Sequence, residues 1–491
     1  MASSLVLITL WWVIEIPRVA MCRVCRMASG RCLARPPMSA ADPSKTPPPP
    51  AEAAEHLTPK RALARHPLLR QWRRNLAFWL GALLVGLVAL AFAHLADLAS
   101  ATFRGVVAHS QWWPWLVCPL GFAALVWLTQ GALKNTRGSG IPQVIVALEQ
   151  RSSPARNALL SVRIAVGKLV MTLLALLVGA SAGREGPTVH IGAALMYSFG
   201  RRLGLYEKHT VSGLIIAGGA AGIAAAFNTP LGGVVFAIEE LSRTFEQRFS
   251  GLVLTAVLLG GMVTLGLMGS YSYFGRLSES MPLGPAWIAV VACGLLGGLL
   301  GGLYCRLVLP TDRGPLSFIS RWRGRWPIRF AAACGLLLAL LGLLSGHHVF
   351  GTGYAETRSI LEGQPVVGHD FLLLKFIANV ISFIAGIPGG LFSPSLTVGA
   401  SLAPWLAPLI PGASLPAVGL LGMSAYLAGV TRTPLTATVI TVEMSHSPDM
   451  LIPILAATLL ASGVSARLNP LPIYHALARQ MQESLGPTKG A

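Results

Sequence analysis

Nine long apolar stretches limit what this chain can fold into more than any other feature of its sequence. They cover residues 76–103, 113–130, 164–182, 211–226, 250–269, 285–308, 328–346, 370–387 and 449–465. Several approach the roughly 20 residues that a helix needs to cross about 30 Å of hydrocarbon. Only 12% of the residues are charged, whereas soluble globular proteins carry about 25%. The sequence therefore predicts an all-α, polytopic membrane protein.

Composition divides the chain into three parts. Residues 1–63 include the Pro/Ala-rich stretch SKTPPPPAEAAE, which cannot bury a core and is expected to be disordered. Met38 is a plausible alternative start, because the apolar run before it is too short to span a membrane and makes a poor signal peptide. We expect a membrane domain over residues 64–482 and a short tail over 483–491.

Much of the positive charge lies before the first apolar stretch. Residues 1–75 hold 12 Lys and Arg against 4 Asp and Glu, a surplus of 8 within a formal net charge of +19. The segment PKRALARHPLLRQWRRN at 59–75 is basic and amphipathic. The positive-inside rule predicts that this segment lies on the cytoplasmic side, against anionic headgroups. The basic balance therefore indicates a membrane surface and no nucleic-acid partner.

Two pairs of segments repeat in the same order along the chain. Residues 183–193 match 390–400 at Gly, Pro, Gly and Ala with an offset of 207. Residues 227–240 match 431–444 at Thr-Pro-Leu, one Val and one Glu with an offset of 204. The matches predict two homologous halves. Transporters built in this way bind their substrate near the midplane of the membrane, where helices are interrupted.

Four short segments place small or flexible residues before a proline that opens an apolar run. They are Gly138–Pro142, Gly183–Pro187, Phe227–Pro230 and Gly390–Pro394. Proline suits the first helical turn, where its missing N–H would have no partner, and glycine lets the preceding backbone turn sharply. The remaining N–H groups carry partial positive charge and cannot face lipid unbonded. Several such ends meeting inside the membrane would bind a dehydrated anion; taken singly, each segment also fits an ordinary helix start at the membrane surface.

Glu185 lies between Arg184 and Gly186, directly before one of these prolines. A charge at membrane depth is costly and usually marks function. The carboxylate is itself an anion, so it would compete with a mobile anion for the same helix end. Burial disfavours its charged form and the helix dipole favours it, so that proton uptake would release it and couple protons to anion entry. The alternative is a helix-capping glutamate paired with Arg184.

Further acidic and aromatic residues lie at helix ends. Glu240 ends the run VVFAIEE and is a candidate for passing protons between the cytoplasm and the interior, or else a solvated carboxylate beside Arg243. Glu239 and Glu443 occupy equivalent positions in the repeat, which favours a structural role. Tyr474 opens the last apolar helix behind two prolines and also fits an interfacial anchor.

The segments GSGIP, GREGP, FNTPL…EE and GIPGGLFSP, followed by a late tyrosine, together resemble the CLC chloride channel and transporter family. The resemblance extends over residues 76–480 in the order found in that family. It implies a homodimer in which each subunit has its own pore. It also implies that two inverted halves with broken helices, about residues 76–275 and 285–480, meet around that pore.

The resemblance also implies roles for individual residues. Ser139 and Tyr474 would coordinate a central anion through their hydroxyls, and the backbone N–H groups of Leu391 and Phe392 would line the site. Glu185 would be the gating glutamate and Glu240 the internal proton glutamate. The remaining anion-binding positions in the matching motifs are Gly140, Ile141, Arg184 and Gly186.

The acid at position 240 is what exchangers of the family commonly keep, so the resemblance implies chloride/proton antiport, with a passive chloride channel of the same fold as the alternative. Ser139 resembles the chloride-selective members, while Gln143 departs from the usual Glu. The resemblance implies a multi-pass protein of a bacterial inner membrane with both termini cytoplasmic. Neither a cofactor nor a metal is expected. An intramembrane hydrolase is disfavoured because His-Glu-x-x-His and Gly-x-Ser-Gly motifs do not occur.

Overall fold

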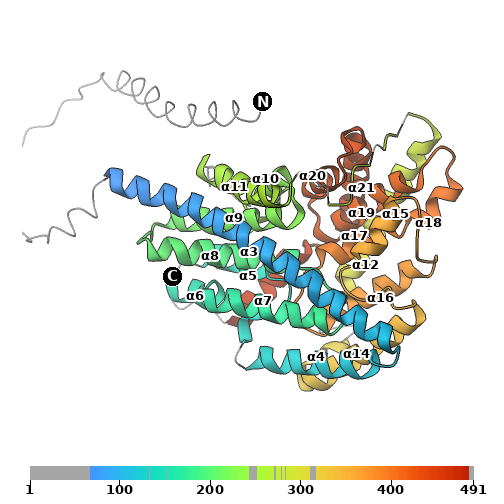
Figure 1. The fold of residues 1–491 in the computed structure, drawn as a ribbon, viewed down its shortest axis with the longest axis horizontal. Coiled ribbons are helices and arrows are strands. Elements are labelled where there is room, and N and C mark those ends of the chain that lie inside the picture. Colours follow the sequence, from blue (N-terminus) through green and yellow to red (C-terminus); the bar gives the residue numbers. More distant parts are fainter. Residues whose placement is uncertain are drawn as a thin grey trace, which may run out of the picture. The chain divides into compact units, whose positions relative to one another are not determined.

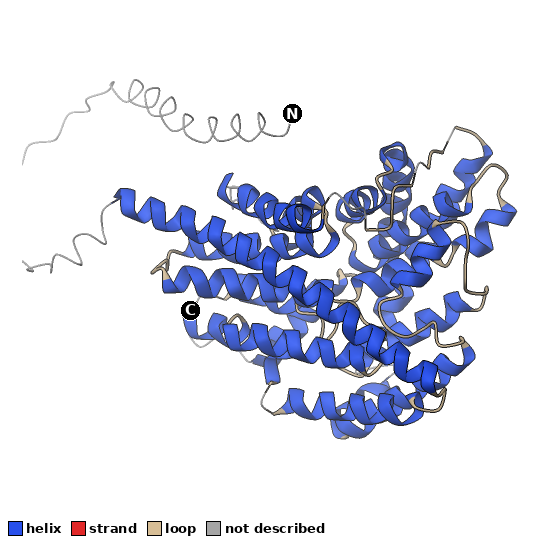
Figure 2. Ribbon diagram, viewed as in Figure 1, coloured by secondary structure: helices blue, strands red, loops and turns tan. Residues whose placement is uncertain are grey.

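The computed structural model describes residues 67–131, 133–150, 152–242, 251–269, 273–277, 279–281, 283–309 and 317–485. These residues form helices joined by loops, and an isolated bridge between two glycines is their sole β pairing (Figure 2). The expected disordered segment at residues 1–63 and most of the predicted tail lie outside the described residues.

The first half of the fold runs from α3 to α11, coloured blue to green in Figure 1. Its elements are α3 (Pro67–His109), α4 (Pro114–Gln130), η1 (Lys134–Thr136), α5 (Ile141–Glu149), α6 (Ser153–Leu159), α7 (Val162–Leu177), α8 (Glu185–Arg202), α9 (Lys208–Phe227), α10 (Pro230–Phe236), η2 (Ala237–Leu241) and α11 (Gly251–Met268). The first turns of α3 contain the end of the basic segment, so three of its arginines, Arg70, Arg73 and Arg74, are helical.

The second half follows the same plan. Its elements are η3 (Pro285–Trp287), α12 (Ile288–Val308), α13 (Ser317–Arg325), α14 (Pro327–Leu344), α15 (Tyr354–Leu361), α16 (Phe371–Ile384), α17 (Phe392–Ala400), α18 (Ala403–Leu406), η4 (Ala407–Leu409), α19 (Leu415–Thr431), α20 (Pro434–Ser445), η5 (Pro448–Met450), α21 (Leu451–Leu468) and α22 (Ile473–Leu485). The end of α22 lies three residues beyond the predicted end of the membrane domain at 482.

Each of the nine predicted apolar stretches contains a helix, which confirms the all-α, polytopic fold. Six helical segments of the described residues are long and apolar enough to cross a membrane. They are Leu68–His109, Ser153–Leu177, Lys208–Phe227, Pro285–Val308, Pro327–Leu344 and Pro448–Ser484. The last contains a bend, since α21 and α22 are separate helices.

Several helices are too short to cross hydrocarbon and are nonetheless deeply buried. α5 and α17 have 9 residues each, which is a length of about 14 Å and about half of the hydrocarbon thickness. Every residue of α17 is buried. At least one end of such a helix must lie inside the protein, where its unbonded backbone groups need partners.

Equivalent glycines bring equivalent helices together in the two halves. A Cβ at Gly192 on α8 would collide with the carbonyl of Gly218 on α9, and a Cβ at Gly399 on α17 would collide with the carbonyl of Gly422 on α19. Only glycine permits this backbone approach. The same pair of contacts therefore recurs at the sequence offsets of 207 and 204, so equivalent helices pack in the same way.

Two glutamates exchange helix caps between the halves. Glu239 accepts hydrogen bonds from Leu435 N and Thr436 N at the start of α20, at 3.1 and 2.7 Å. Glu443 accepts from Leu231 N and Gly232 N at the start of α10, at 3.2 and 2.7 Å. A carboxylate at a helix N-terminus bonds orphan N–H groups and interacts favourably with the dipole. The structure thus places both residues in the structural role that the repeat favoured.

We expect Glu443→Gln and Glu239→Gln to destabilise the fold by similar amounts. Each change removes one charged acceptor from a helix start, at a cost of about 1–2 kcal/mol. This corresponds to an apparent unfolding temperature that is lower by about 2–5 °C in detergent solution. Glu483→Gln is the control, because the pair of Glu483 with Arg479 is exposed and contributes about 0.5 kcal/mol or less. Unchanged unfolding temperatures in both capping variants would contradict this account.

Candidate functional site

Three of the four predicted glycine/proline segments meet in the interior. Gly183 and Gly390 pair through two backbone hydrogen bonds of 2.7 and 2.6 Å, which form the isolated antiparallel bridge. Gly389 N donates to Gly138 O at 3.3 Å. A Cβ at Gly186 would lie 3.1 Å from Ser139 O and 3.4 Å from the Cα of Gly390. The starts of α5, α8 and α17 are therefore gathered in one place, as the sequence predicted.

The fourth segment differs from this expectation. It opens α10, and the N–H groups at its start donate to Glu443 from the other half. Glu443 belongs to the reciprocal pair of capping glutamates that joins the halves, so this helix start has a structural partner. The ring of Phe227 does reach another of the segments, with its centroid 6.1 Å from that of Phe392. The segment is repeated in both halves because each copy begins a helix that is capped by a glutamate of the other half.

Glu185 is fully buried at the start of α8 and reaches across to α17. Its Oε1 accepts a hydrogen bond from the Ser393 hydroxyl, and its Oε2 accepts one of 3.4 Å from Ser393 N. The carboxylate therefore occupies the N-terminal end of α17, where the helix dipole favours negative charge. Sequence reasoning did not select Ser393, although a serine directly before the proline of a helix start is a donor that could have been noticed.

Arg184 does not pair with Glu185. Its Nη1 donates to Ala93 O and to Asp97 Oδ1 on α3, each at 2.7 Å. The pairing with Arg184 in that alternative is therefore replaced by the pair with Asp97, although Glu185 does accept a backbone N–H at the start of a helix, α17. The guanidinium of Arg184 is held beside the site by α3, and its charge is fixed next to the buried carboxylate.

The hydroxyls of Ser139 and Tyr474 lie close together. Both side chains are buried, at 2% and 0% exposure, and neither hydroxyl has a well-formed hydrogen bond within the described part of the chain. The Tyr474 hydroxyl interacts electrostatically with Glu185 and Glu240. The ring of Tyr474 stacks on that of Phe392, with centroids 6.2 Å apart. Complete burial rules out the interfacial anchor that was the alternative for Tyr474.

The remaining predicted anion-binding positions line the same region. Gly140 and Ile141 open α5, and Gly186 lies in the first turn of α8. Leu391 and Phe392 open α17. All five are buried. Gly140 has a φ of 109°, and a Cβ there would lie 2.7 Å from the Cβ of His190, so glycine is required for the approach of this loop to α8.

Glu240 lies in η2, a π-helical turn at the end of α10. Its side chain is 1% exposed, and its Oε1 lies 3.4 Å from Nε2 of His475 on α22. The alternative of a solvated carboxylate is wrong because of this burial. Arg243, its other suggested partner, lies outside the described residues. Tyr474 and His475 are consecutive in the first turn of α22, so Glu240 lies against the same end of this helix as Tyr474.

A buried lysine that sequence reasoning missed holds the loop that carries Ser139. Lys168 on α7 donates from Nζ to the carbonyls of Thr136 and Gly138, each at 2.7 Å, and to that of Arg137 at 3.3 Å. Its equivalent at the offset of 207, Lys375, likewise donates to two loop carbonyls at 2.8 and 3.0 Å. The available signal was a lysine inside an apolar stretch, where a charge needs partners.

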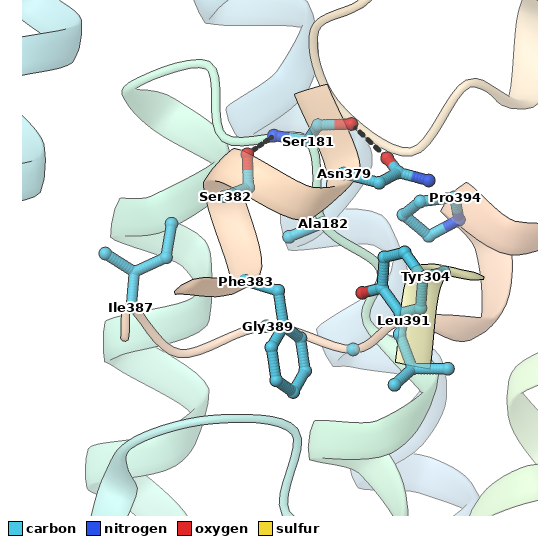
Figure 3. A pocket seen from close by; sticks show the side chains of 11 residues that line it. Ser181, Ala182, Tyr304, Asn379, Ser382, Phe383, Ile387, Gly389, Leu391 and Pro394 are labelled. Atoms are coloured by element: carbon cyan, nitrogen blue, oxygen red, sulfur yellow. Dashed lines mark hydrogen bonds between the residues drawn. The ribbon is translucent and has the colours of Figure 1, made fainter. Parts of the chain in front are cut away.

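A small pocket lies behind the loop of Gly390 (Figure 3). Figure 3 shows Ser181 facing α16, where Ser181 N donates to Ser382 Oγ at 3.1 Å and Ser181 Oγ to Asn379 Oδ1 at 2.6 Å. Tyr304 and Leu391 line the opposite wall. These bonds fasten the loop before α8 to the second half, and so they hold Glu185 against α17.

The amino-acid sequence is similar to that of known proteins. Residues 120–466 match the family model described as voltage gated chloride channel. The H(+)/Cl(-) exchange transporter ClcA of Salmonella gallinarum is 30% identical over 441 residues, which cover 83% of this chain and 89% of the relative. The ClcA protein of Klebsiella pneumoniae subsp. pneumoniae is 31% identical over 425 residues, with coverages of 81% and 86%.

Solved structures share the fold. A slow cyanobacterial Cl-/H+ antiporter superimposes with a TM-score of 0.72 at 24% identity, covering 84% of this chain and 99% of that structure. A CLC-type fluoride/proton antiporter superimposes with a TM-score of 0.69 at 24% identity, covering 82% and 97%. At 24% identity, these superpositions establish that the chain shares the fold of these proteins.

Proposed function

The chain belongs to the voltage gated chloride channel family, and on that premise we propose that it exchanges chloride for protons across a bacterial membrane. The curated relatives are named H(+)/Cl(-) exchange transporters. The observation that carries the proposal is the Glu185 carboxylate at the start of α17, bonded to the N–H and the hydroxyl of Ser393. An anionic side chain occupies a helix end that suits a mobile anion, and it is a side chain that protons can neutralise.

In this proposal the anion binds where the three helix starts meet. Backbone N–H groups of Leu391 and Phe392 and the hydroxyls of Ser139 and Tyr474 replace part of the water that chloride loses. These donors are neutral, so the anion is held without a full positive charge in direct contact and remains able to leave. Gly140, Ile141 and Gly186 allow the backbone to approach, and Arg184 adds a fixed positive charge beside the site.

Protons and chloride are coupled because they compete through Glu185. While ionised, the carboxylate occupies the end of α17 and excludes chloride from that position. Protonation removes the charge that holds it there, so the side chain leaves and chloride enters. Glu240 supplies the proton from the other side of the site, past the Tyr474 hydroxyl with which both carboxylates interact. Neither ion then completes the passage without the other.

The membrane domain is proposed to cover residues 64–482 and to work as a homodimer in the inner membrane, with both termini cytoplasmic. The arginines in the first turns of α3 support this orientation through the positive-inside rule. Leucines such as Leu84, Leu299 and Leu337 are 40–49% exposed on long apolar helices, which suits contact with lipid tails. Leu231 and Leu435, each at least half exposed on α10 and α20, are available to a second subunit.

The test is the reversal potential of purified protein in liposomes with opposed chloride and pH gradients. An exchanger moves protons uphill when chloride flows downhill, and its reversal potential departs from the chloride Nernst potential. We expect both effects. A Nernstian reversal potential and no uphill proton movement would identify a passive chloride channel and contradict the proposal.

A further inference from the structure

His475 is a titratable side chain that lies directly against Glu240. Its Nε2 is 3.4 Å from Glu240 Oε1. The two side chains differ in their access to water, since that of Glu240 is 1% exposed and that of His475 is 11% exposed. An imidazole changes its charge in the physiological pH range and serves as a proton shuttle in proteins. The pair therefore joins a carboxylate that water does not reach to a titratable group that water does reach.

The π-helical turn explains how Glu240 comes to face α22. η2 carries two adjacent carboxylates, Glu239 and Glu240. Glu239 is directed to the start of α20, where it accepts two backbone hydrogen bonds, while Glu240 is directed inward to His475. π-turns inside helices occur frequently at functional sites because they change the direction of side chains. The local geometry thus separates a structural carboxylate from one that faces the site.

The face of α22 that carries His475 leads from the interior to water. Residues three, four, seven and eight apart share a helix face, so Arg479, Gln482 and Glu483 continue the face of His475. Arg479 and Glu483 form an ion pair of 3.2 Å and are 70% and 65% exposed. Gln482 is hydrogen bonded to Glu149 at the end of α5. His475 is therefore the position at which this polar, water-facing stripe reaches the buried carboxylate.

We propose that His475 is a further proton-carrying residue, which transfers protons between the water-facing end of α22 and Glu240. The inference rests on the proposed exchange of chloride for protons. In the transfer, the imidazolium Nε2–H bond breaks and an O–H bond forms on Glu240 Oε1. The products are a neutral imidazole and a neutral carboxylic acid, and the imidazole then takes its next proton from water. Transport in the opposite direction reverses the same steps.

The test compares proton and chloride fluxes of His475→Gln in liposomes. Glutamine keeps an N–H donor and a similar reach but does not take up a proton. Because a positioned proton-transfer group typically contributes about a hundredfold or more, proton flux should fall by at least about tenfold while chloride flux continues. Arg479→Gln is the matched control, since it removes a positive charge one turn further along the same face. It should leave the ratio of the two fluxes unchanged.

Three results would overturn the assignment of His475. The first is an unchanged ratio of proton to chloride flux in His475→Gln. The second is an equal fall of both fluxes in His475→Gln, which a merely structural role would produce. The third is a loss of proton flux in Arg479→Gln as large as that in His475→Gln. The double variant His475→Gln, Glu240→Gln should move chloride as Glu240→Gln alone does, because the two residues act in series. If the wild-type protein moves no protons, the proposed exchange itself fails; if it does, the variants bear on His475 alone.

Discussion

Replacement of Glu185 by alanine should leave a protein that moves chloride but no longer moves protons. The carboxylate is the group that occupies the start of α17, and without it the helix end is open to chloride at every moment. No protonatable side chain then has to leave before the anion enters. In liposomes with an outward chloride gradient, uphill proton uptake should fall to the level of vesicles without protein, while chloride efflux remains measurable.

Glu483→Gln is the control for Glu185→Ala, because it also removes a carboxylate but lies 65% exposed on α22. It should transport both ions as the wild type does. Undiminished proton uptake in Glu185→Ala would show that another group couples the ions. Loss of both fluxes would show that the carboxylate is needed to keep the site folded.

Glu240→Gln should also uncouple proton flux from chloride flux, in this case because the proton no longer reaches Glu185. The amide fills the same space next to Tyr474 and His475 and carries no exchangeable acid proton at physiological pH. Because the proposed chloride ligands lie at the starts of α5, α17 and α22, the chloride path should stay intact. We expect chloride flux to continue and proton flux to reach background in the same simultaneous recording.

The adjacent Glu239→Gln is a sharp control for Glu240→Gln. Its carboxylate caps α20, so the variant should be less stable and yet keep the wild-type ratio of protons to chloride. If Glu240→Gln couples normally, Glu240 does not belong to the proton path. If Glu239→Gln loses coupling as well, the charge of η2 as a whole, and not one directed side chain, is responsible.

The sequence predicted the features that depend on neighbouring residues. A helix lies in each of the nine apolar stretches, and six helical segments of the described residues are long enough to span hydrocarbon, because burial in lipid requires a long apolar run. Glycine and proline before apolar runs located the helix starts, because those residues act through local backbone geometry. The repeat at offsets of 207 and 204 indicated which segments are equivalent in the two halves.

The contacts across the halves were beyond a local analysis. Ser393 meets Glu185 over a separation of 208 residues, and Glu443 meets Gly232 over 211. Such pairs depend on how the halves pack, which periodicity and spacing do not specify. For the same reason the segment at Phe227–Pro230 looked like an anion-binding helix start, although the other half fills it with a carboxylate.

The central claim is that Glu185 and a halide compete for the end of α17. It is tested most directly by anomalous density from crystals grown in bromide, for the wild type and for Glu185→Gln. We predict a bromide peak beside Ser139 and Tyr474 in both, and an additional peak at the Ser393 N–H in the variant alone. Identical bromide positions in the two proteins, or bromide absent from the region between Ser139 and Ser393, would contradict the account.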